Sequence, residues 1–124
     1  MKKLTTIISA VMALGLGTSA SAQVNLTAET ASPSSAPGVS VIALSEAAAK
    51  YNVANMQVTT GQTLTNSVQN VAEGKSDVAA APFVLPFLLS RAVGPYAKVG
   101  KEKGAELASQ LAVLYTYRIA CQGL

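Results

Sequence analysis

The pattern of apolar and polar residues predicts a strand followed by a helix between residues 24 and 52. Apolar and polar residues alternate over part of Val24–Ala31, which is typical of a strand. The polar loop Thr30–Gly38 follows. From Val39 the apolar residues fall near helical spacing, and we expect this helix to end at Tyr51–Asn52.

The same succession of strand and helix then repeats. Met56–Thr60 is predicted as a second strand, and Gln62–Glu73 as a short amphipathic helix that stops at Gly74. Val78–Ala81 is short, small and wholly apolar, which fits a strand covered on both faces. Its alanines would also suit a helix, but the helix, glycine and turn before it favour the strand.

The remaining pattern predicts two helices and a last strand. Residues 83–93 have a helical pattern, and a polar connector punctuated by glycine and proline leads to a further helical turn or two over 102–110. Leu111–Ala120 is β-branched, aromatic and apolar, so we predict a strand there. Helices between successive strands imply an α/β fold with a mainly parallel sheet flanked by helices.

The N-terminus carries the three parts of a secretory signal peptide. Lys2 and Lys3 form a basic start, residues 4–17 are apolar, and Ala20-Ser21-Ala22 is a small-residue cleavage site. The apolar part is too short for a permanent membrane span. We therefore expect residues 1–22 to be removed, residues 23–124 to form the mature domain, and the protein to lie in the periplasm.

The amino-acid composition excludes several kinds of functional site. The chain has no histidine, which excludes a His-based metal site or a Ser-His-Asp triad within it. The lone Cys121 has no internal disulfide partner, so a small buried residue is the expected role. The full chain has nine basic and six acidic residues. Removal of the signal peptide would also remove Lys2 and Lys3, which brings the net charge close to zero. The near-neutral mature chain gives no basis for nucleic-acid binding, and we predict neither an enzyme nor a cofactor or metal protein.

Three loops are predicted to meet at one edge of the sheet. They are Ser32–Gly38, Thr60–Thr63 and Ala81–Phe83. Ligands of parallel sheets bind beyond the carboxyl ends of the strands. The free N–H groups and dipole of the helix after the first loop would suit a carboxylate or phosphate. The alternative is that Ser34 or Ser35 only caps that helix.

Several short motifs occur in a set order, and together they resemble a known family. They are Thr30-Ala31-Ser32-Pro33, Thr59-Thr60-Gly61, Glu73-Gly74-Lys75-Ser76-Asp77-Val78-Ala79 and Leu114-Tyr115. The chain looks like the N-terminal region of the TAXI-type solute-binding receptors of TRAP transporters. The resemblance covers nearly all of the mature chain but about a third of a full receptor.

The resemblance implies the first lobe of a type II periplasmic binding fold that captures a small anionic solute, an organic acid or a glutamate-like amino acid. It also implies two partners, a TRAP membrane permease and a C-terminal lobe that this chain lacks. A lobe without its partner is expected to bind weakly. Carried over by position, the ligand-facing candidates are Ser32, Ser34, Ser35, Thr60, Gly61, Gln62, Thr63, Ala81 and Pro82.

The chain departs from the family pattern inside the first two loops. Ser34-Ser35 replaces the usual Gly-Gly, and the two side chains restrict the approach of the backbone to a ligand. Ala36-Pro37-Gly38 stands for Thr-Tyr-Tyr and removes an aromatic wall, and Gln62 replaces a glycine. The family's own ligand is therefore not implied, and an exported interaction or structural α/β domain without its own ligand is the alternative function.

Two groups of side chains have competing interpretations. Tyr115 and Tyr117 are placed on one face of the predicted last strand, with Arg118 opposite. Arg118 could clamp a carboxylate, but a solvated edge arginine is the favoured interpretation. Glu73 and Asp77 flank the turn into the third strand, away from the predicted ligand edge, so we do not expect catalysis by this pair.

Overall fold

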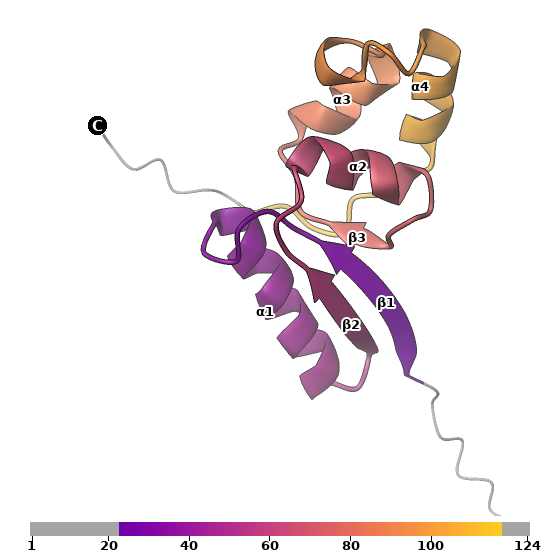
Figure 1. Cartoon of the computed structure of the whole chain (residues 1–124). Coiled ribbons are helices and arrows are strands. Elements are labelled where there is room, and N and C mark those ends of the chain that lie inside the picture. The colour runs from indigo at the N-terminus through magenta and orange to yellow at the C-terminus, as the bar shows by residue number, and fades with distance from the viewer. Residues whose placement is uncertain (1–22, 118–124) are drawn as a thin grey trace, which may run out of the picture.

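The computed structural model describes residues 23–117 and contains a small parallel sheet flanked by helices. Figure 1 shows the strands β1 (Val24–Glu29), β2 (Ala54–Thr59) and β3 (Val78–Ala79) in the order β2-β1-β3. The predicted α/β class with a parallel sheet is thus confirmed. The predicted signal peptide, Arg118 and Cys121 lie outside the described residues.

The central strand is β1, which pairs along its whole length with β2, from Val24 opposite Ala54 to Glu29 opposite Thr59. On its other side only Ala28 and Glu29 pair with β3. The sheet is therefore widest at the carboxyl ends of its strands, the edge where the predicted ligand loops begin.

In the described part of the chain, four α-helices and one short 3-10 helix connect and follow the strands. They are α1 (Ala36–Lys50), α2 (Leu64–Ala72), α3 (Val84–Arg91), η1 (Gly94–Tyr96) and α4 (Lys101–Ser109). In Figure 1, α1 lies along the sheet, whereas α2, α3 and α4 gather at the other end of the molecule. No helix within residues 23–117 has both the length and the hydrophobicity to cross a membrane.

Helices α1 and α2 lie on opposite faces of the sheet. Side chains alternate along a strand, so Leu26 and Glu29 of β1 point to different faces. The carboxylate of Glu29 accepts hydrogen bonds from Asn70, which puts α2 on the face to which Glu29 points. Right-handed crossovers from β1 to β2 and from β2 to β3 require this arrangement.

The larger apolar cluster lies between α2, α3, η1 and α4, away from α1. Its buried members are Val68, Ala72, Leu89, Tyr96 and Leu107. The side chain of Tyr96 is 1% exposed, and its hydroxyl donates to the carbonyl of Thr65 at 2.9 Å. Burying the ring while satisfying its polar end makes Tyr96 the link between η1 and α2.

The predicted last strand is wrong over the part that the structure describes. Residues 111–117 form no strand, and within the described chain no backbone hydrogen bond joins 112–117 to another segment. Instead the hydroxyl of Tyr115 reaches the carbonyl of Ser40 in α1, at 3.4 Å. Strand propensity reflects fit to a sheet surface, and this segment lies against α1 rather than in the ladder. Residues 118–120 of the prediction lie outside the described residues.

Candidate functional site

The loop between β1 and α1 is closed by Ser35, which is the N-cap of α1. Its hydroxyl oxygen accepts from the N–H of Gly38 at 3.2 Å and its hydroxyl donates to the carbonyl of Ser32 at 2.6 Å. The capping role considered from the sequence is therefore confirmed for Ser35. Ser32 and Ser34 are exposed, and their hydroxyl oxygens lie 3.0 Å apart.

The first turn of α1 packs directly under this loop. Gly38 is buried, and a Cβ at this position would overlap the carbonyl oxygen of Ser32 and crowd Pro33. Only glycine leaves room for the loop to fold over the helix. This contact holds Ser32 and Ser34 above the N-terminus of α1.

The loop after β2 is bonded to the loop after β1. The N–H of Gly61 donates to the carbonyl of Ala31 at 3.0 Å, and the N–H of Gln62 donates to the carbonyl of Thr30 at 3.1 Å. Thr63 caps α2 by accepting from the N–H of Asn66 at 3.3 Å. The two loops therefore meet as predicted, but the N–H groups of Gly61 and Gln62 are used within the protein.

The loop after β3 opens onto a groove beside that strand, which we call the β3 groove. It has a volume of about 930 Å³ and runs between β3, α1 and residues 110–117. Ala81 and Pro82 line it from the third loop, and Pro37 lines it from the first turn of α1. The first and third predicted loops are thus brought to one groove.

A second depression adjoins the β3 groove, and we call it the tyrosine hollow. Its volume is about 580 Å³, and it is lined by Ser34, Ala36, Val39, Ser40, Ala43, Leu44, Tyr115 and Tyr117. Leu44 and both tyrosines also line the β3 groove. Of the candidate residues, Ser34, Ala81 and Pro82 line one of these two hollows, whereas Ser32, Ser35 and the second-loop residues line neither.

The sequence did not indicate that Tyr115 and Tyr117 belong beside the first loop. Their ring centroids are 6.1 Å apart and the rings are tilted by 40°. The alternation Tyr-Thr-Tyr correctly placed them on one side of their segment. Their position against α1 depends on the path of residues 111–117, which no local pattern specified.

Thr30 was also missed as a distinctive residue. It follows β1 directly, its side chain is fully buried, and its hydroxyl has no partner within the described chain. The Ser67 hydroxyl in α2 is in the same condition. Buried hydroxyls without partners are uncommon in folded proteins. In the sequence, Thr30 is the first residue of the Thr30-Ala31-Ser32-Pro33 motif, which carries no sign that its hydroxyl is buried.

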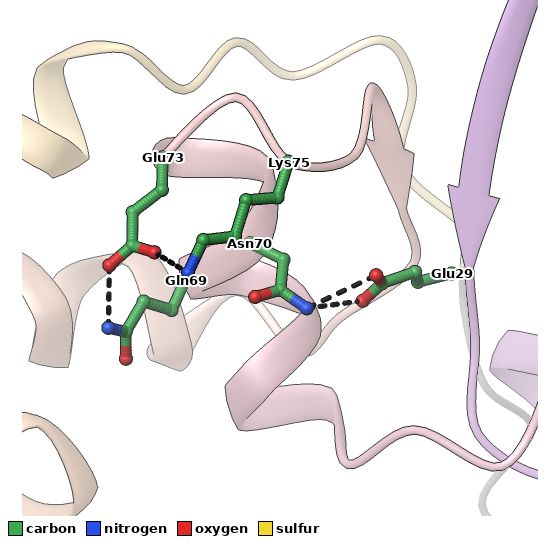
Figure 2. Close-up of polar contacts among 5 residues, drawn as sticks. All are labelled: Glu29, Gln69, Asn70, Glu73 and Lys75. Carbon is green, nitrogen blue, oxygen red and sulfur yellow. Dashed lines mark hydrogen bonds and ion pairs between the residues drawn. The ribbon is translucent and has the colours of Figure 1, made fainter.

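The acidic side chains near α2 are occupied by structural partners (Figure 2). Glu73 forms an ion pair with Lys75 at 2.6 Å and accepts from Gln69 at 2.8 Å. The hydrogen bond from Lys75, followed by that from Gln69, lowers the pKa of the Glu73 carboxyl. Both partners favour the charged form of the acid.

Asp77 is similarly engaged, with Thr27 of β1. It accepts from the N–H of Thr27 at 2.7 Å and from its hydroxyl at 2.8 Å, and these bonds lower the pKa of the Asp77 carboxyl. Glu73 follows α2 and Asp77 precedes β3, so both lie on the amino-terminal side of that strand. Because β3 has only 2 residues, Asp77 nevertheless lines the β3 groove with Ala81 and Pro82, and the expectation that it lies away from the ligand edge is wrong. Within residues 23–117, no three acidic, histidine or cysteine side chains gather as metal ligands would.

Comparison of the chain with protein-family models, with curated proteins and with solved structures finds no match.

Proposed function

We propose that this chain is the ligand-capturing lobe of an exported solute-binding receptor of the TAXI type, with a small organic acid as its solute. The observation that carries the proposal is the strand order β2-β1-β3. This order makes the gap between β1 and β3 a switch point, where ligands of open parallel sheets bind. The loops that begin there supply Ser34, Ala81 and Pro82 to adjoining hollows.

Polar groups at this edge suit a carboxylate. The hydroxyls of Ser32 and Ser34 are exposed above the N-terminus of α1 and are held there by the packing of Gly38. Each hydrogen bond from a hydroxyl to the charged carboxylate would contribute about 1.5–3 kcal/mol when shielded from water, and less in an exposed site. A few such bonds in an open site predict weak binding, and a second lobe would strengthen it by excluding water.

The proposal includes delivery of the solute to a TRAP membrane permease after export to the periplasm. It assigns the chain a binding role without catalysis. The strongest support from the sequence is the signal peptide together with the ordered motifs that resemble the TAXI receptors. A solute-binding role in transport requires two partners, which are the membrane permease and the second lobe.

Solute binding is tested by following backbone amide chemical shifts and thermal unfolding of the purified chain with millimolar organic acids. At ten times its dissociation constant, a solute that binds only the folded chain adds about 1.4 kcal/mol of stability. We expect chemical shift changes in the first and third loops, and weaker binding after Ser34→Ala. Ser90→Ala is the matched control, because Ser90 donates to its own helix, at the carbonyl of Phe87.

The alternative, an exported interaction domain without its own ligand, has one specific observation in its favour. Phe83, Val84 and Phe87 around the start of α3 are 77%, 52% and 52% exposed. Exposed apolar side chains in a cluster are typical of contact surfaces. A folded chain that no organic acid shifts, and that self-associates with rising concentration, would favour this alternative and contradict the receptor proposal.

A further inference from the structure

We propose that the captured solute is an organic acid with a planar apolar body, such as an arylalkanoate, rather than a glutamate-like amino acid. This inference rests on the proposed receptor function and assigns its solute class. Its basis is the pair of tyrosines that line both hollows beside the first and third loops.

The tyrosine pair provides the aromatic surface. Tyr115 and Tyr117 are 50% and 41% exposed, so their rings are accessible, and they stand next to each other with centroids 6.1 Å apart. Aromatic rings favour offset or tilted contacts with other rings at about 4.5–7 Å, and such contacts stabilise a complex beyond the effect of area burial. A planar ring placed against either tyrosine would gain this contact.

The hollow beneath the tyrosines is apolar on its α1 side. Ala36, Val39 and Ala43 come from successive turns of α1, and Val39 is 55% exposed. Burying this surface under an apolar solute removes it from water, which favours binding. The Ser34 hydroxyl shares the wall of the same hollow and is the polar group that would receive the acid end of the solute.

Charge also favours a solute with an uncharged body. Among the described residues that line the two hollows, Asp77 alone is charged, and it is bonded to Thr27. A second carboxylate on the solute would lose water without gaining a cationic partner from these side chains, which is costly.

The size of the site agrees with this class. Ligand sites for small molecules are typically clefts of about 300–1,000 Å³ with mostly apolar walls and a few polar groups. The β3 groove, at about 930 Å³, falls in this range, and the tyrosine hollow is a shallow, open extension of it. A single aromatic ring with a short acid chain would fit in the groove.

The test compares solutes that differ by one ring. The purified chain is titrated with 3-phenylpropionate, propionate, glutamate and 2-oxoglutarate, and dissociation constants are taken from amide chemical shifts. We expect 3-phenylpropionate to bind at least about tenfold more tightly than propionate, which equals 1.4 kcal/mol, and more tightly than both dicarboxylates. Tighter binding of glutamate or 2-oxoglutarate would overturn the solute class and leave the receptor function standing.

Variants locate the ring contact. Tyr115→Leu removes the ring and should weaken 3-phenylpropionate binding by about three- to tenfold without changing propionate binding, whereas Tyr115→Phe keeps the ring and should preserve the preference. Tyr51→Leu is the control, because Tyr51 is 71% exposed at the end of α1 and lines neither hollow. If Tyr115→Leu does not fold, Tyr117→Leu replaces it.

Two further outcomes contradict the inference. Equal losses for Tyr115→Leu and Tyr51→Leu would show that the ring contact is not at the tyrosine hollow. A folded chain that binds none of the four acids would overturn both the solute class and the receptor function.

Discussion

Asn70 joins α2 to the central strand by donating its side-chain N–H groups to both carboxylate oxygens of Glu29, at 3.1 and 3.0 Å (Figure 2). Both side chains are partly buried, and Glu29 is the last residue of β1. The contact therefore fixes α2 against the strand whose carboxyl end begins the first loop. It is a bond between residues 41 positions apart in the sequence.

Replacing Asn70 with aspartate should destabilise the fold. Asn70→Asp removes the donor and sets two carboxylates against each other, which leaves a partly buried charge unpaired at a cost of about 1–3 kcal/mol. Urea unfolding measures the loss, and part of it should return at acid pH because protonation relieves the repulsion. Asn66→Asp makes the same charge change at an exposed position in the first turn of α2, where the helix dipole favours an acid, so the midpoint should stay the same or rise slightly.

Asp77 should make stability depend on pH at the acid end. Hydrogen bonds from the backbone and hydroxyl of Thr27 lower the pKa of its carboxyl in the folded state below the ordinary value of 3.8. The stabilisation is present above the unfolded-state pKa and is lost as pH falls through the lower folded-state pKa. When the urea unfolding midpoint is plotted against pH, Asp77→Asn should reduce its fall at acid pH.

Thr27→Val separates the two causes of that shift. It removes the hydroxyl and retains the backbone N–H, which is the larger cause, so the variant should keep part of the acid dependence. An acid limb identical in the native chain and in Asp77→Asn would contradict this account of Asp77.

A methyl group at position 38 should be poorly tolerated. Gly38→Ala would normally favour a helix, but here the new Cβ overlaps the Ser32 carbonyl and forces the loop away from α1. We expect a loss of about 1–3 kcal/mol by thermal unfolding, as for other overpacked sites. Ser45→Ala, later in α1, is the control and should be neutral or slightly stabilising. Equal midpoints for the two variants would show that the loop does not need this close contact.

Tyr96 should govern stability at the alkaline end. Burial raises the pKa of its phenol above the ordinary value of 10.0. The neutral form is therefore favoured in the folded state, and its stabilisation is lost as pH rises through the raised pKa. Tyr96→Phe should cost about 1–3 kcal/mol at neutral pH by leaving the Thr65 carbonyl without its donor. In denaturant titrations, the difference in unfolding free energy between Tyr96→Phe and the native chain should become smaller at strongly alkaline pH.

Local pattern predicted most of the elements in this protein. Periodicity and glycine punctuation placed the first three strands and the helices within a few residues of their observed bounds. The parallel arrangement followed because a helix lies between successive strands. The prediction failed for residues 111–117, whose β-branched and aromatic composition suits a strand but which lie against α1 instead of pairing with the sheet.

The candidate site was predicted only in outline. Ser34, Ala81 and Pro82 do line adjoining hollows, but the N–H groups of Gly61 and Gln62, proposed from position, are bonded to the first loop. Which N–H groups remain free for a ligand depends on the approach of two loops that are distant in sequence. No spacing within either loop contains that information.

The sequence by itself determined the class of elements, their order and the edge where loops must gather, because each depends on short-range periodicity and on chain connectivity. Tertiary structure alone decided that Tyr115 and Tyr117 lie against α1, that Asn70 binds Glu29, and that Gly38 lies under Ser32. These contacts depend on how separate segments pack, and packing is a property of the whole fold rather than of any one stretch.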